Sequence, residues 1–154
     1  MIVTKKGDIT LIKSGIILHQ VNCQGVMGSG VARAIKEKWP IVFKEYKNFC
    51  ITECTSNSAS LLGKVLYVNV DNQIIIANCF SQNRYGLDKK RYTSYDALDI
   101  CLQKVRKTLE HFKDSTIHFP LIGGGSGGGY WPIVQEIIEH NLPDPIHKSL
   151  WTHE

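Results

Sequence analysis

The chain has 154 residues, of which 43% are hydrophobic, and its formal net charge is +4. This length and composition fit one domain spanning residues 1–154 with its own core. No apolar run approaches the roughly 20 residues of a membrane span, and the basic residues are too dispersed for a nucleic-acid-binding face, so neither partner is expected. Five scattered cysteines, an odd number, and the absence of a signal-peptide pattern predict a reducing, cytoplasmic setting.

Short apolar runs alternate with helical patterns along the chain, which is typical of a layered α/β domain. The expected strands are residues 2–4, 16–21, 65–70, 74–78, 117–120 and 149–151. Helices are expected over 31–39, 40–49, 93–111 and around 133–138, where apolar residues recur at three- and four-residue intervals. The turn residues 71–73 predict a hairpin between the third and fourth strands, so the sheet should be mixed.

Two glycine-rich loops, residues 25–30 and 123–129, each follow an apolar run and precede a helical pattern. Because glycine lacks a Cβ, such loops turn through positive φ and bring backbone N–H groups close to a ligand. A helix that opens after the loop adds unpaired N–H groups and the positive end of its dipole, which suit a phosphate. We expect the two loops to clamp a diphosphate from both sides. The alternative is that they are flexible linkers.

Four motifs stand in a fixed order: residues 7–10 (Gly-Asp-Ile-Thr), residues 21–32 around the first glycine loop, residues 61–65 with Gly63-Lys64 before a strand, and residues 120–125. Together they resemble the macro domain family, whose members bind ADP-ribose. The resemblance covers nearly the whole chain. It implies an α/β fold, a three-layer α/β/α macro domain with a mixed central sheet.

Within that family, residues 19–25, Trp39-Pro40 and residues 61–64 look most like the ADP-ribose 1″-phosphate phosphatase branch. The resemblance implies a hydrolase that converts ADP-ribose 1″-phosphate to ADP-ribose and phosphate. The sequence shows no metal motif, and we expect a monomer with no cofactor and no metal. Two alternatives stay open: a non-catalytic reader of ADP-ribose, and an ADP-ribosyl hydrolase acting on modified protein or a related nucleotide. The family's covalent-lysine mechanism is doubtful, because residues 79–82 and 126–128 contain neither the lysine nor the aspartate that it uses.

The resemblance places adenine near the start of the chain. Asp8 would accept from the exocyclic amine of adenine, with Ile9 beside it, although an aspartate here also suits a turn or helix cap. Trp151 would close over the adenine face, or would be ordinary packing.

The resemblance places the diphosphate and the distal ribose between the two glycine loops. Asn22, at the end of a strand, would orient the distal ribose, or would close a turn. Tyr130 would wall the distal pocket, or would pack under the following helix. The backbone donors expected around the diphosphate are Gly28, Ser29, Gly30, Val31 and Ala32 from the first loop, and Gly123, Gly124, Gly125, Ser126, Gly127 and Gly128 from the second.

His19 and Asn22 are the predicted catalytic residues. A neutral imidazole at His19 could take a proton from water during phosphate hydrolysis. However, residues three apart in an unbroken strand point to opposite faces, so only a bend would bring the two together. A core histidine is the alternative for His19.

Overall fold

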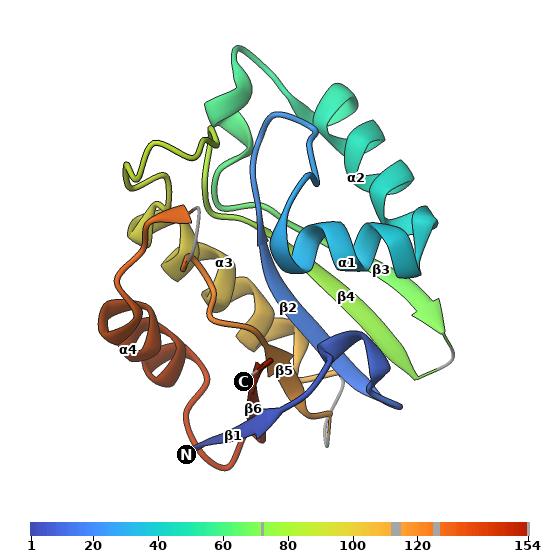
Figure 1. Ribbon diagram of the computed structural model, residues 1–154, viewed down its shortest axis with the longest axis vertical. Helices are drawn as coiled ribbons and strands as arrows, with labels where there is room; N and C mark the ends of the chain where they lie inside the picture. Colours follow the sequence, from blue (N-terminus) through green and yellow to red (C-terminus); the bar gives the residue numbers. More distant parts are fainter. Residues whose placement is uncertain (72, 112–114, 125–126, 154) are drawn as a thin grey trace.

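The computed structural model describes residues 1–71, 73–111, 115–124 and 127–153. Six strands form one mixed sheet with helices on both of its faces (Figure 1). One face carries α1 (Gly30–Lys38) and α2 (Pro40–Glu53), and the other carries α3 (Tyr95–Thr108) and α4 (Trp131–Asn141). The three-layer α/β/α arrangement predicted from the sequence is confirmed.

The strands are β1 (Ile2–Lys6), β2 (Gly15–Val21), β3 (Val65–Asp71), β4 (Ile74–Phe80), β5 (Ile117–Phe119) and β6 (Lys148–Thr152). They lie in the order β1-β6-β5-β2-β4-β3. Only the β3–β4 pair is antiparallel among these six, so the expected hairpin is confirmed; Asn72 of its turn lies outside the described residues. The parallel strands bring their carboxyl ends to one edge of the sheet, where open α/β sheets bind ligands.

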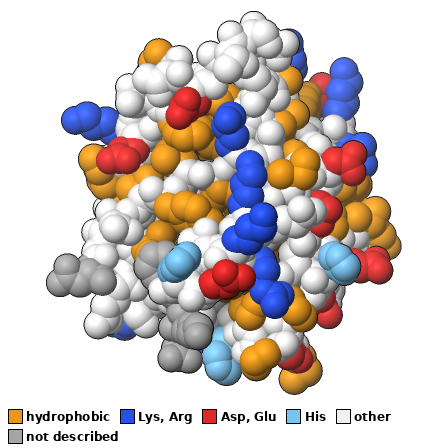
Figure 2. Space-filling view, turned by 180° about the vertical axis from the view of Figure 1, so that it is seen from behind, with side chains coloured by type: hydrophobic (Ala, Val, Ile, Leu, Met, Phe, Trp, Pro, Cys, Tyr) orange, Lys and Arg blue, Asp and Glu red, His pale blue; other side chains and the backbone are white. Residues whose placement is uncertain are grey.

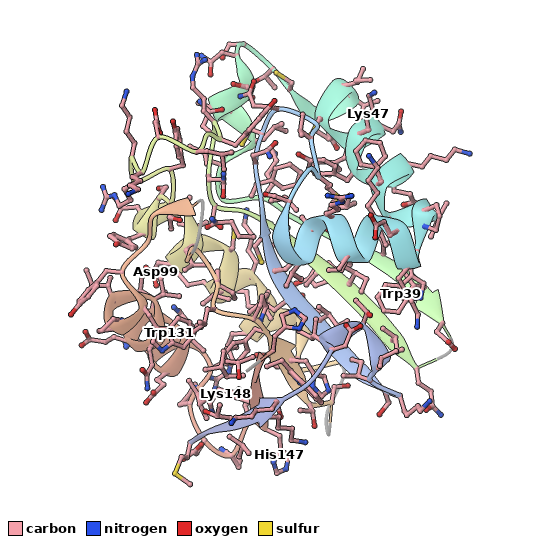
Figure 3. The ribbon with its side chains drawn as sticks, in the orientation of Figure 1. Trp39, Lys47, Asp99, Trp131, His147 and Lys148 are labelled. Atoms are coloured by element: carbon pink, nitrogen blue, oxygen red, sulfur yellow. The ribbon has the colours of Figure 1, made fainter. Side chains whose placement is uncertain are left out.

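Local capping chemistry sets several element boundaries. The helix expected over 93–111 is shorter, because Ser94 accepts a hydrogen bond from the Ala97 N–H and so caps α3 ahead of Tyr95. Trp39 separates α1 from α2 (Figure 3), and Pro40 opens α2 in its first turn, where its missing N–H costs nothing. Two short 3-10 helices, η1 (Ile9–Leu11) and η2 (Ser58–Leu61), were not predicted.

The central strand β2 contributes side chains to two separate hydrophobic clusters, because successive side chains of a strand point to opposite faces of the sheet. Ile16 and Leu18 pack with the cluster under α3 and α4, whereas Ile17 and Val21 pack with the cluster under α1 and α2. This alternation fixes the register of β2, and it also decides which face each polar side chain near its end must take.

Within the described ranges, no helix is both long and apolar enough to cross a membrane. The five cysteines are free thiols. Seen from behind (Figure 2), Lys and Arg side chains form a row that Asp and Glu side chains flank, so on this face the charges of both signs are interspersed.

Candidate functional site

A cleft of about 900 Å³ lies at the carboxyl edge of the sheet. Its walls come from η1, the end of β2 with the first glycine loop, the start of α1, the segment after β4, the second glycine loop and the end of β6. The ionisable side chains among the described lining residues are His19, His153 and Tyr85, with no carboxylate. An anionic ligand in this cleft therefore meets backbone donors without an opposing acidic group.

Asn22 lies one residue beyond β2, at the entry to the first loop, and its amide is used within the protein. Its Oδ1 accepts from the Gln24 N–H at 2.9 Å and from the Tyr46 hydroxyl at 2.8 Å, and its Nδ2 donates to the Val26 carbonyl at 2.8 Å. These contacts close the turn that the sequence left as the alternative role. Asn22 also lines the cleft, so its predicted contact with ribose stays a prediction.

Tyr46, on α2, is hydrogen-bonded to the backbone of the first loop. Its hydroxyl accepts from the backbone N–H groups of Gly25 and Val26, each at 3.1 Å, and donates toward Asn22. Gly25 has a φ of 78°, a conformation that suits glycine and turns these two N–H groups toward one acceptor. The first loop is thus shaped by a buried side chain that the sequence-based site did not include.

The second loop is held by Thr93, which is 2% exposed. The carbonyl of Gly127 accepts from the backbone N–H groups of Tyr92 and Thr93, and the Thr93 hydroxyl lies 3.2 Å from the same carbonyl. Gly123 has a φ of 75°, and a Cβ there would lie 2.9 Å from the Thr93 hydroxyl oxygen. Glycine is therefore required at this position by the fold itself.

The segment from Gln82 to Thr93 makes hydrogen bonds to both glycine loops. None of its residues was among the predicted site residues. Asn83 accepts at its carbonyl from the Cys23 N–H of the first loop. Gln82 accepts from the Gln20 Nε2–H at 2.6 Å, and Gln20 donates also to Thr93 at 3.1 Å. The signal in the sequence was a run of polar residues directly after a buried strand, which is where ligands of α/β sheets sit.

His19 lies on the face of β2 that packs against α1 and α2, and it is 1% exposed. Its Nε2–H donates to Asn78 Oδ1 at 2.6 Å, and Asn78 Nδ2 donates to the Leu66 carbonyl, which fixes the amide's orientation. The buried Nδ1 has no hydrogen-bond partner in the described structure. Burial lowers the pKa of His19 to about 4, so the ring is neutral at pH 7.

Both predicted catalytic residues line the cleft, although three positions separate them. The expected conflict of faces does not arise, because Asn22 lies in the loop, where strand alternation no longer applies. The orphaned Nδ1 of His19 could accept a proton, but its burial makes it a weak base and screens it from water. These features favour the core role, while the base assignment stays a prediction.

The other end of the cleft contains Ile9, Gly7 and Trp151. The indole N–H of Trp151 donates to His118 Nδ1 at 2.9 Å, and His118 Nε2 in turn faces the Ser14 carbonyl at 3.1 Å. Because Nδ1 accepts from the indole and Nε2 faces a carbonyl oxygen, the neutral ring of His118 carries its proton on Nε2. Trp151 is held in place by this pair and still presents part of its surface to the cleft.

Asp8 is exposed and lies outside the cleft lining. Its Oδ1 accepts from both the hydroxyl and the backbone N–H of Thr10, and these bonds lower the pKa of the carboxyl. This is the cap role that the sequence left open. Both bonds go to Oδ1, so Oδ2 is the oxygen left to accept from the amine of adenine. That contact stays a prediction.

The structure gathers most of the predicted site around one cleft. Gly128 and Tyr130 lie outside its lining, and Tyr130 instead precedes α4 with its N–H donated to the Tyr95 hydroxyl. Gly125 and Ser126 lie outside the described residues. The predicted residues that line the cleft are Ile9, His19, Asn22, Gly28, Ser29, Gly30, Val31, Ala32, Gly123, Gly124, Gly127 and Trp151.

A three-layer fold with a cleft between two glycine loops at the strand ends is the architecture of an α/β nucleotide-binding domain. Residues 18–138 match the family model of the Macro domain, and the chain belongs to the macro domain family. A macrodomain protein from Streptomyces coelicolor superposes with a TM-score of 0.82 at 25% identity, covering 100% of both chains. A protein of unknown function from Bacteroides thetaiotaomicron gives 0.86 at 31% identity, covering 98% of this chain and 97% of that one.

Curated relatives carry two kinds of name. The chain is 25% identical to an ADP-ribose 1″-phosphate phosphatase of Debaryomyces hansenii, over 88% of this chain and 87% of that protein. It is 30% identical to one of Saccharomyces cerevisiae, over 72% of this chain and 63% of that protein. It is also 25% identical to a DNA ADP-ribosyl glycohydrolase of Mycobacterium tuberculosis, over 94% of this chain, but it spans only 40% of that protein's length.

Proposed function

We propose that the protein binds ADP-ribose in the cleft. The observation that carries this proposal is the pair of glycine loops on the cleft wall, with Gly28 to Ala32 on one side and Gly123, Gly124 and Gly127 on the other. Backbone N–H groups on both sides of a diphosphate neutralise it without a cation. Family membership supports the same ligand, since a DarTG protein from Thermosipho africanus with this fold was solved in complex with ADP-ribose.

The ligand's orientation follows from the chemistry of the two ends. Ile9 and Trp151 offer apolar and aromatic surface for adenine. The opposite end, between the loops, is lined by Asn22 and Gln82, whose amide nitrogens each make one hydrogen bond to a described residue, so each keeps an N–H for a hydroxyl of the distal ribose. The diphosphate then spans the glycine loops.

Isothermal titration calorimetry tests the binding proposal with ADP-ribose, AMP and ribose 5-phosphate as ligands. We expect ADP-ribose to bind far more tightly than either fragment, because only it reaches both ends and the loops between them. Equal affinity for AMP would contradict the diphosphate clamp. No binding of any adenylate would contradict the proposal as a whole.

We further propose that the bound substrate is ADP-ribose 1″-phosphate and that the protein releases its terminal phosphate. The phosphatase names of relatives at 25% and 30% identity support this reaction. In this reaction the unpaired Nδ1 of His19, on a ring that Asn78 orients, would accept the proton from water, and the burial of the ring counts against that role.

A reader without catalysis is the second candidate, and the burial of His19 favours it. Burial lowers the pKa of His19 to about 4, and the Gln20 amide is committed to hydrogen bonds with Gln82, Thr93 and Ser81. Release of inorganic phosphate from ADP-ribose 1″-phosphate separates the two candidates. Parallel assays with ADP-ribosylated protein and ADP-ribosylated DNA show whether the protein removes ADP-ribose instead, which would contradict both.

A further inference from the structure

Tyr46 is a buried tyrosine that reaches from α2 to the first glycine loop. It is 0% exposed, and its ring stacks on Phe80 at 5.7 Å between centroids. Burial raises the pKa of the phenol, so the hydroxyl keeps its proton at all ordinary pH values. The ring is therefore part of the core, and the hydroxyl is its single polar atom, placed directly under the loop.

The contacts of this hydroxyl match its hydrogen-bonding capacity. A phenol oxygen has two lone pairs and one proton. Here the lone pairs receive the N–H groups of Gly25 and Val26, each at 3.1 Å. The proton points to Asn22, whose backbone carbonyl and Oδ1 both lie at 2.8 Å.

Two successive N–H groups that converge on one acceptor form the concave nest that usually binds an anion. In this loop the nest at Gly25 and Val26 is filled by the protein's own hydroxyl. Those two donors are therefore withdrawn from the ligand, while Gly28, Ser29 and Gly30 stay exposed along the cleft. Asn22 is anchored by the same oxygen, so one atom defines the shape of the loop and the pose of its leading side chain.

We infer that Tyr46 is a positioning residue that holds the first loop ready for the diphosphate and distal ribose of the ligand. The inference rests on the proposed binding of ADP-ribose in this cleft. Without the hydroxyl, the Gly25 and Val26 donors lose their acceptor and the loop must find another arrangement. Tyr46 makes no hydrogen bond to the described residues of the adenine end, so the effect is confined to the ligand's other half.

Tyr46→Phe tests the inference, because it keeps the ring and removes one oxygen. We expect the Kd for ADP-ribose to rise ~10-fold, from the loss of net hydrogen bonding around the loop, with the Kd for adenosine unchanged. Hydrogen exchange read by NMR should show faster exchange at the Gly25 and Val26 amides. A purely structural role would not separate the two ligands.

Tyr67→Phe is the matched control. Its hydroxyl is half-buried and bonds Thr108 at 3.0 Å, between β3 and α3, away from the cleft lining. We expect its affinities for both ligands to equal those of the wild type. Gly25→Ala is a second variant outside the core, because a φ of 78° strains alanine while its Cβ has open space; it should also weaken ADP-ribose and spare adenosine.

The outcomes separate this inference from the proposed function. If the wild type fails to bind ADP-ribose, the proposed function is wrong and this inference falls with it. If the wild type binds and folded Tyr46→Phe binds ADP-ribose equally well, only the inference is overturned. Equal weakening of both ligands would also overturn it, since it would indicate general loosening of the domain.

Discussion

Acidification should destabilise the protein through His19. The folded-state pKa of this imidazole is about 4, well below its ordinary value of 6.5, because burial penalises the charged ring more than the Asn78 contact stabilises it. Between these two pH values the unfolded chain takes up the proton more readily than the folded one. The stability contributed by neutral His19 is therefore fully present above pH 6.5 and is lost as the pH falls toward 4.

The size of the effect follows from the two pKa values. Proton linkage gives a loss of about 2 kcal/mol by pH 5 and about 3 kcal/mol by pH 4, relative to pH 7. His19→Gln removes the titration and keeps an N–H that can donate to Asn78. Its stability should fall less than that of the wild type over the same range. Other groups, including His118 and Asp8, titrate alike in both proteins. Their contributions therefore cancel when the stability change of His19→Gln is subtracted from that of the wild type.

Urea denaturation of both proteins at pH 7 and pH 5 measures this difference directly. If the wild type loses no more stability than His19→Gln, the buried-imidazole reasoning is wrong. Phosphate release by the same variant decides the catalytic question. A general base would show a loss of about 10²–10⁴-fold, whereas a core histidine leaves the rate of the folded protein close to that of the wild type.

Further variants test the cleft. Gly28→Val should abolish ADP-ribose binding in calorimetry, because the added side chain faces the cleft. Its unfolding midpoint should stay unchanged, since a Cβ there meets Val26 Cγ1 at an ordinary contact distance of 3.5 Å. Retained affinity would contradict the phosphate site. Thr93→Val should cost about 1–3 kcal/mol in urea denaturation and weaken ADP-ribose, since the Gln20 amide loses an acceptor; wild-type stability would refute the bracing role. His118→Phe should shift Trp151 fluorescence and weaken adenosine binding, because the indole N–H loses its acceptor; an unchanged spectrum would contradict this coupling.

Local patterns in the sequence were enough to predict the layers and the hairpin. Apolar runs marked the strands, and the polar turn between Val70 and Ile74 marked the antiparallel pair. The glycine loops were identifiable because a backbone that must pass through positive φ near a ligand leaves few choices of residue, as at Gly123. These features depend on residues close together in the chain.

The features that were missed depend on distant contacts. Tyr46 stands at helical spacing with Val42 and Phe49 and so indicates a core position, which is correct for its ring. Its hydroxyl contacts residues 20 to 24 positions away, and nothing local shows that α2 places it against the loop. The insertion of β6 between β1 and β5 is likewise set by tertiary packing.

The pairing of the first strand with the last has a consequence for synthesis of the chain. β1 lies at the sheet edge and pairs in parallel with β6, so β1 must wait for the synthesis of residues 148–152 before it can pair. A nascent chain that stops before them leaves the buried strand β5 as an open edge, a template for aggregation. It also lacks Trp151 at the cleft wall. Ligand capture should therefore begin only when translation has delivered β6, so that retention on an immobilised ligand separates chains that contain β6 from chains that stop before it.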